Sequence, residues 1–179
     1  MSAKERIIQR AAFLAAVVCT LTVAVTTAAA FAPAIRTWAG WRSRAEVSYP
    51  VGRGTDVPPA TYAGAPFTLL IFARSDCGVC EQVKPWLAAA VAAAGREPSV
   101  RVVVLATGAH AADDVRFAGE LGVDPDHVVS VAGTGLRVNI VPTVVLVDRH
   151  GLVRYSQEGA PRTDQGQTIS EMMHVVSSH

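Results

Sequence analysis

The stretch FTLLIFARSDCGVC, residues 67–80, places two cysteines directly after an apolar run. The run from Phe67 to Ala73 is bounded by turn residues and predicts a strand that is covered on both faces. Beyond it, apolar residues recur at helical spacing from Cys80 to Ala94 and stop at Gly95, which predicts a helix. The two thiols therefore lie where a buried strand passes into a helix.

Two thiols three positions apart at a helix start can close a small disulfide ring. The unpaired N–H groups and the positive end of the helix dipole favour the thiolate of the first cysteine. We therefore expect Cys77 to attack and Cys80, more enclosed by its own helix, to resolve the mixed disulfide. Gly78 gives the turn freedom without a side chain that crowds the attacking sulfur.

Two other uses of the cysteine pair are possible. A structural zinc site needs two further ligands, but His110, His127 and His150 show no paired spacing, and Cys19 lies within an apolar segment. A static disulfide with so small a loop stabilises a chain little. We therefore predict no metal and no organic cofactor, the redox-active group being the Cys77–Cys80 disulfide itself.

Along the rest of the chain, apolar patterns typical of strands alternate with apolar patterns typical of helices. Apolar strand patterns and amphipathic helix patterns follow the first helix in a fixed order: strand 100–106, helix 111–121, short strand 128–131, a hairpin of strands 143–147 and 152–155, and helix 168–176. This order predicts an α/β protein with a mixed central sheet flanked by helices.

These features resemble the thioredoxin superfamily, in particular its membrane-anchored TlpA/ResA-like thiol-disulfide oxidoreductases. Pro85 lies five residues after Cys80, where that family's active-site helix carries a proline, and residues 142–151, PTVVLVDRHG, are similar to its P-T-x-x-L-I-D-x-x-G hairpin. The resemblance implies a thioredoxin-like domain over residues 62–179. It also implies a cis peptide bond at Pro142 facing the cysteines, and thiol-disulfide oxidoreductase activity.

The same resemblance marks residues that shape the site. Proline has no N–H near the thiols, and the main chain of Val141 is left to pair with an extended substrate segment. Asp76 stands where the family has tryptophan, and its carboxylate opposes thiolate formation at Cys77. Val79 replaces the proline of the common C-G-P-C, which leaves the redox potential open.

The Cys80 thiol has to lose its proton before it can resolve the mixed disulfide. Thioredoxins proper keep a buried acidic residue six positions before the first cysteine, and here that position is Ile71. The proton acceptor for Cys80 is then another group or water. Glu81 and Lys84 are the nearby candidates, although both also fit solvated charges on a helix surface.

A membrane segment is predicted upstream. Residues 11–35 carry no charge and follow the basic Lys4, Arg6 and Arg10. As a helix they would span roughly 37 Å at ~1.5 Å per residue, enough for a ~30 Å hydrocarbon core. We expect a cytoplasmic head (1–10), a single transmembrane anchor in the cytoplasmic (inner) membrane (11–35) and a Gly/Pro-rich linker (36–61), with a cleaved signal peptide as the alternative.

Composition limits the partners. The chain has 179 residues, a net charge of +1 and 17% charged residues, so it lacks the basic surface of a nucleic-acid-binding protein. We expect a monomer whose periplasmic, extracytoplasmic domain exchanges with protein thiol or disulfide clients and with a redox partner. The alternative is a non-catalytic thioredoxin-like binding module that keeps Cys77–Cys80 as a structural disulfide.

Overall fold

The computed structural model describes residues 49–178 apart from 133, 135, 137 and 163. Residues Val47–His179 form one compact unit. Its elements, in chain order, are α2 (Pro59–Tyr62), β1 (Phe67–Ala73), α3 (Gly78–Gln82), α4 (Lys84–Ala94), β2 (Val100–Ala106), α5 (Ala111–Glu120), the 3₁₀ helix η1 (Pro125–His127), β3 (Val128–Ser130), β4 (Thr143–Asp148), β5 (Val153–Glu158) and α6 (Gln165–Ser177).

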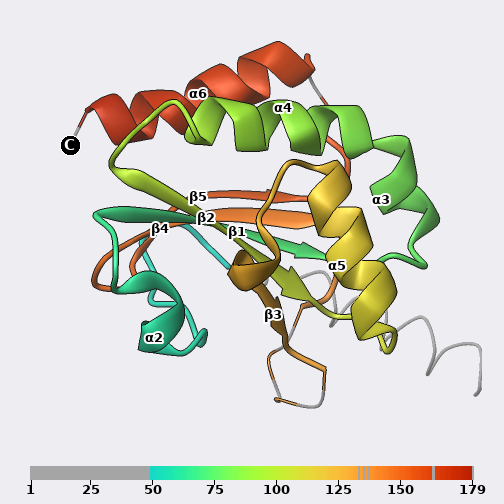
Figure 1. Cartoon of the computed structure of the whole chain (residues 1–179). Coiled ribbons are helices and arrows are strands. Elements are labelled where there is room, and N and C mark those ends of the chain that lie inside the picture. Colours follow the sequence, from blue (N-terminus) through green and yellow to red (C-terminus); the bar gives the residue numbers. More distant parts are fainter. Residues whose placement is uncertain (1–48, 133, 135, 137, 163, 179) are drawn as a thin grey trace, which may run out of the picture. The chain divides into compact units, whose positions relative to one another are not determined.

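The strands form one mixed sheet in the order β3-β2-β1-β4-β5 (Figure 1). β1 runs parallel to β2, and β2 runs parallel to β3, whereas β4 is antiparallel to both β1 and β5. All seven residues of β1 are buried, as its apolar sequence predicts for a central strand with both faces covered. The predicted mixed α/β sheet is confirmed.

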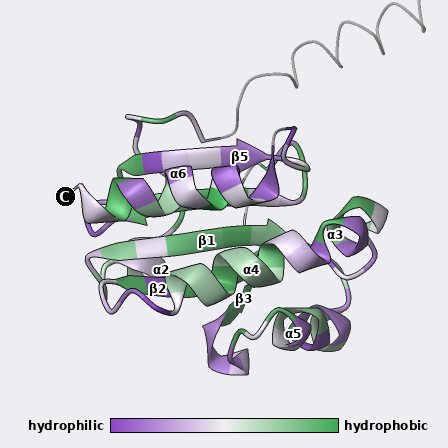
Figure 2. Ribbon diagram, turned by 90° about the horizontal axis from the view of Figure 1, so that it is seen from above, coloured by the Kyte–Doolittle hydropathy of each residue, from purple (hydrophilic) through white to green (hydrophobic). Residues whose placement is uncertain are grey.

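The two faces of the sheet bury alternate residues of each strand. Leu69 and Ile71 pack with the apolar sides of α3, α4, α5 and α6. Leu70 and Phe72 pack on the opposite face with Tyr49, Val57 and Tyr62. Figure 2 shows the contrast between the hydrophobic β1 and α4 and the more hydrophilic edge strand β5.

The single helix predicted for Cys80–Ala94 is divided in the structure. α3 ends at Gln82 and α4 begins at Lys84, with Val83 between them at φ −99° and ψ 9°. Pro85 explains the division, because its ring has no N–H to donate and clashes with the carbonyl four residues earlier. The break separates the turn that holds the cysteines from the long helix that covers the sheet.

Residues 49–61 pack on the sheet. The ring of Tyr49 stacks on Phe72 with centroids 4.9 Å apart, and Val57 is buried. The N–H of Gly52 donates to the carbonyl of Val153 at 2.9 Å. The packed unit therefore extends upstream of Tyr62, into part of the segment 36–61 in which we expected a linker.

The predicted membrane segment, residues 11–35, lies outside the described residues. Among the residues that the structure describes, no helix is both long enough and apolar enough to cross a membrane.

Candidate active site

The two cysteines lie at the carboxyl end of β1. After Ala73 the chain makes a turn closed by the N–H of Cys77, which donates to the carbonyl of Arg74 at 3.3 Å. Cys77 is the N-cap of α3, with extended backbone, and its Sγ accepts a hydrogen bond from the N–H of Cys80 at 3.3 Å. The three-residue spacing thus lets the first sulfur satisfy an otherwise unpaired amide of the helix start.

The two sulfurs differ in environment. Both cysteines are free thiols, and the exposed fraction is 7% for Cys77 and 0% for Cys80. Burial, followed by the hydrogen bond with Cys77, raises the pKa of Cys80 to about 12, although the main chain and charge of Arg74 act in the opposite direction. Cys77 is therefore the sulfur within reach of a partner, while Cys80 keeps its proton at neutral pH.

The second motif meets the first in space. The Val141–Pro142 peptide bond is cis, as the resemblance implied, and the Cys77 thiol donates to the carbonyl of Val141 at 3.7 Å. The buried Thr143 holds this loop, because its Oγ1 donates to the carbonyl of Ile140 at 2.7 Å. We predicted site roles for Val141 and Pro142 from the sequence but none for Thr143, because a threonine at the start of a strand is common.

Two large apolar side chains are exposed in α3 and in the loop before β4. Val79 and Ile140 are large hydrophobic residues with exposed fractions of 43% and 45%. Apart from its chain neighbours Cys77 and Val79, no atom lies within 4 Å of a Cβ added at Gly78. The expected role of Gly78 in leaving the attacking sulfur uncrowded stays a prediction. Val79 belongs to α3, and Ile140 belongs to the loop before β4.

Asp76 forms an ion pair that we did not predict from the sequence. Its Oδ1 lies 3.1 Å from Nε of Arg74, and both side chains are about half exposed. An exposed ion pair contributes little to stability, but the guanidinium offsets the field of the carboxylate next to Cys77. The opposing effect that we expected from Asp76 is therefore reduced.

Glu81 and Lys84 are engaged with each other. Nζ of Lys84 lies 2.7 Å from Glu81 and 2.6 Å from Glu120, and it sits over the ring of Phe117 at 5.1 Å from the centroid. The hydrogen bond that Lys84 donates to Glu120, followed by the one that it donates to Glu81, raises the pKa of Lys84. These charges tie the active-site helices to α5, and the partners described for them do not include the Cys80 thiol.

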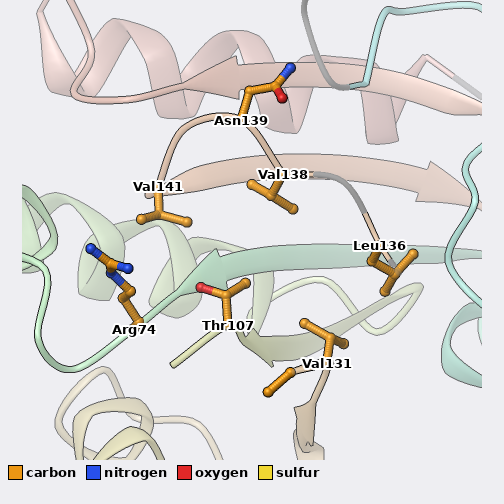
Figure 3. Close-up of a pocket in the computed structure, with 8 residues that line it drawn as sticks. Arg74, Thr107, Val131, Leu136, Val138, Asn139 and Val141 are labelled. Carbon is orange, nitrogen blue, oxygen red and sulfur yellow. The ribbon is translucent and has the colours of Figure 1, made fainter. Parts of the chain in front are cut away.

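A cavity of about 380 Å³ opens beside the cis-proline loop (Figure 3). Arg74, Thr107 and Val131 directly follow the parallel strands β1, β2 and β3, and Val141 closes the other side. The remaining lining residues are Ala132, Leu136, Val138 and Asn139. The carboxyl ends of parallel strands are a common place for ligand sites in α/β proteins, and this cavity shares Arg74 and Val141 with the surroundings of the cysteines. Within the described part of the chain, no three His, Cys, Asp or Glu residues form a group that could hold a metal ion.

This fold, with a Cys-x-x-Cys helix start facing a cis-proline loop, is the thioredoxin-like fold. No family model and no curated protein sequence matches the chain. Solved structures with a similar fold include a Chlorobium tepidum protein provisionally described as thiol:disulfide interchange protein DsbE (21% identity, TM-score 0.54, 71% of this chain and 99% of that one). Others are a Bacteroides thetaiotaomicron protein provisionally described as a protein disulfide isomerase (13%, 0.55, 72% and 91%) and a thiol:disulfide interchange protein from Bacteroides sp. (16%, 0.53, 73% and 93%). At these identities the likeness establishes the fold, and the activity has to be argued from the site.

Proposed function

We propose that the chain is a thiol-disulfide oxidoreductase that acts on protein thiols and disulfides. One observation carries the proposal: Sγ of Cys77 lies between the N–H of Cys80 and the carbonyl of Val141. The amide stabilises negative charge on the sulfur, and the carbonyl belongs to the loop whose main chain we expect to pair with a client. An inert disulfide would need neither feature.

The reaction runs through a mixed disulfide. The Cys77 thiolate attacks one sulfur of a client disulfide, and the other client sulfur leaves as a thiolate. Cys80 then loses its proton and its sulfur attacks Sγ of Cys77, which releases the first client sulfur as a thiolate. The client gains two electrons and the Cys77–Cys80 pair becomes a disulfide; the reverse sequence oxidises a client dithiol. A redox partner resets the pair in either direction.

The client fits as an extended protein segment. We expect main-chain groups of Val141 to pair with such a segment beside the attacking sulfur, a mode of recognition that tolerates many sequences. Val79 and Ile140 are exposed apolar side chains that a client could contact, and the cavity lined by Arg74 and Val141 has room for a client side chain. This surface favours proteins over small polar thiols.

The location belongs to the proposal as well. The uncharged segment 11–35 behind a basic head supports a membrane anchor with the domain on the periplasmic side. Fractionation of cells that express the full chain tests this, together with the mass of the mature protein. We expect full-length protein in the membrane fraction, whereas a chain that starts near residue 31 would identify a cleaved signal.

Trapping of the mixed disulfide tests the activity. In Cys80→Ser the resolving sulfur is absent, so a client should stay bound to Cys77 and be released by dithiothreitol. The matched control is Cys77→Ser, which should trap nothing. If Cys80→Ser captures no protein, and the purified wild-type domain neither reduces nor oxidises a model protein disulfide, the pair is a structural disulfide in a binding module.

A further inference from the structure

We propose that Asp114 is a positioning residue for the active-site turn, holding the main chain before Cys77 so that its sulfur meets the Cys80 amide. The inference rests on the proposed function, in which Cys77 is the attacking group. Asp114 lies in the first turn of α5, only 3% exposed. Nothing in its sequence context marks it, because acidic residues are common in the first turn of a helix.

The carboxylate reaches the turn directly. Oδ1 of Asp114 accepts a hydrogen bond from the N–H of Ser75 at 2.7 Å, across 39 residues of sequence. Ser75 lies inside the turn that the Cys77 N–H closes on the Arg74 carbonyl. A short bond to a carboxylate is stronger than one between neutral groups. It therefore fixes the Arg74–Ser75 peptide unit, whose carbonyl accepts the hydrogen bond from the N–H of Cys77.

The second carboxylate oxygen of Asp114, Oδ2, indicates that this side chain is not there only to fill space in the core. Oδ2 is buried and has no hydrogen-bond partner among the described atoms. A buried carboxylate oxygen without a partner is costly to fold around. An apolar side chain at this position would avoid that cost, so the carboxylate is kept for the bond that its Oδ1 makes.

Gly108 makes room for this arrangement. A Cβ at Gly108 would lie 2.6 Å from Oδ2 and 2.9 Å from Oδ1 of Asp114. The carboxylate thus lies between the loop after β1 and the loop after β2. Adding a methyl group at Gly108 should push it off Ser75 while leaving its charge in the protein.

Alkylation of Cys77 by iodoacetamide at pH 7, in a Cys80→Ser background, tests the proposal. Asp114→Ala removes the acceptor and loosens the turn, and we expect alkylation to slow about tenfold. Asp114→Asn keeps an oxygen for the Ser75 amide and should react within about threefold of the parent. Gly108→Ala should slow the reaction as Asp114→Ala does. The matched control is Asp113→Ala, because Asp113 is the exposed neighbour and pairs with Arg116 instead.

The outcomes separate the positioning role from its rivals. Equal rates for Asp114→Ala and Asp113→Ala would overturn the proposal. An Asp114→Asn variant as slow as Asp114→Ala, or faster than the parent, would assign the effect to charge and would overturn it too. Should Asp114→Ala fail to fold, Gly108→Ala and Asp114→Asn still decide. Alkylation needs no client, so these ratios hold whether or not the wild type exchanges disulfides.

Discussion

Burial of Cys80 predicts a large and measurable difference in thiol reactivity. Its pKa of about 12 lies three units above the ordinary value of 9.0, which corresponds to about a thousandfold less thiolate at pH 7. A thiolate of higher pKa is intrinsically more nucleophilic, and with a Brønsted slope of about 0.4–0.5 this recovers part of the loss. The net effect is a reaction about 30-fold to 60-fold slower than that of an unperturbed cysteine.

The assay compares folded and unfolded protein in the Cys77→Ser variant, where Cys80 is the reacting thiol of the domain. Serine removes the competing sulfur and leaves burial, the first cause of the shift, in place. Disulfide exchange at Cys80 is followed with a small aromatic disulfide from pH 7 to pH 11, with and without urea. We expect the folded rate to keep rising beyond pH 9, while the unfolded rate levels off near its ordinary pKa. A plateau of the folded rate near pH 9 would show that burial does not raise the pKa of Cys80.

Two further changes test the electrostatics. Asp76→Asn removes the carboxylate beside Cys77 and leaves the Arg74 guanidinium without its partner. Alkylation of Cys77 at pH 7 should therefore become about twofold to threefold faster in low salt and lose most of that gain in 1 M salt. An unchanged rate would show that the Arg74–Asp76 pair does not act on the sulfur. Asp148→Asn should lower the free energy of unfolding, measured in urea, by about 2–4 kcal/mol. The reason is that this buried carboxylate accepts hydrogen bonds from the N–H groups of His150 and Leu152 and from the Arg154 guanidinium. Burial by itself would raise the pKa of Asp148, but these hydrogen bonds lower it, so the wild type should lose stability as the pH falls below about 4 and the variant should lose less of it.

Local patterns were enough to predict the order of the elements. The apolar run 67–73 and the helical spacing after Cys80 are properties of short segments, and each was found within a few residues of its predicted bounds. The approach of Val141 to Cys77 followed from the family resemblance, which supplies the three-dimensional arrangement that the spacing alone does not.

The features that we did not predict depend on contacts between groups that are far apart in the sequence. Asp114 and Asp113 are adjacent and chemically identical, yet one is buried against Ser75 and the other pairs with Arg116 in solvent. Tyr49 lies in a stretch whose glycines and prolines indicate irregular structure, and irregular structure can still pack, as its stacking on Phe72 shows. Neither outcome is encoded by the periodicity of its own segment.

The hydrogen bond that caps α3 has a consequence for the timing of the proposed reaction. The sulfur that accepts from the Cys80 amide is the same atom that bonds to the client. Once it is part of a mixed disulfide it carries no negative charge and accepts that bond more weakly. The first turn of the helix is then least restrained at the step when Cys80 has to leave its buried position and approach Cys77. Hydrogen exchange at the amide of residue 80, measured in the Cys80→Ser variant, should therefore be slower when Cys77 is a thiolate than in the trapped mixed disulfide, so this one proton reports the progress of the reaction.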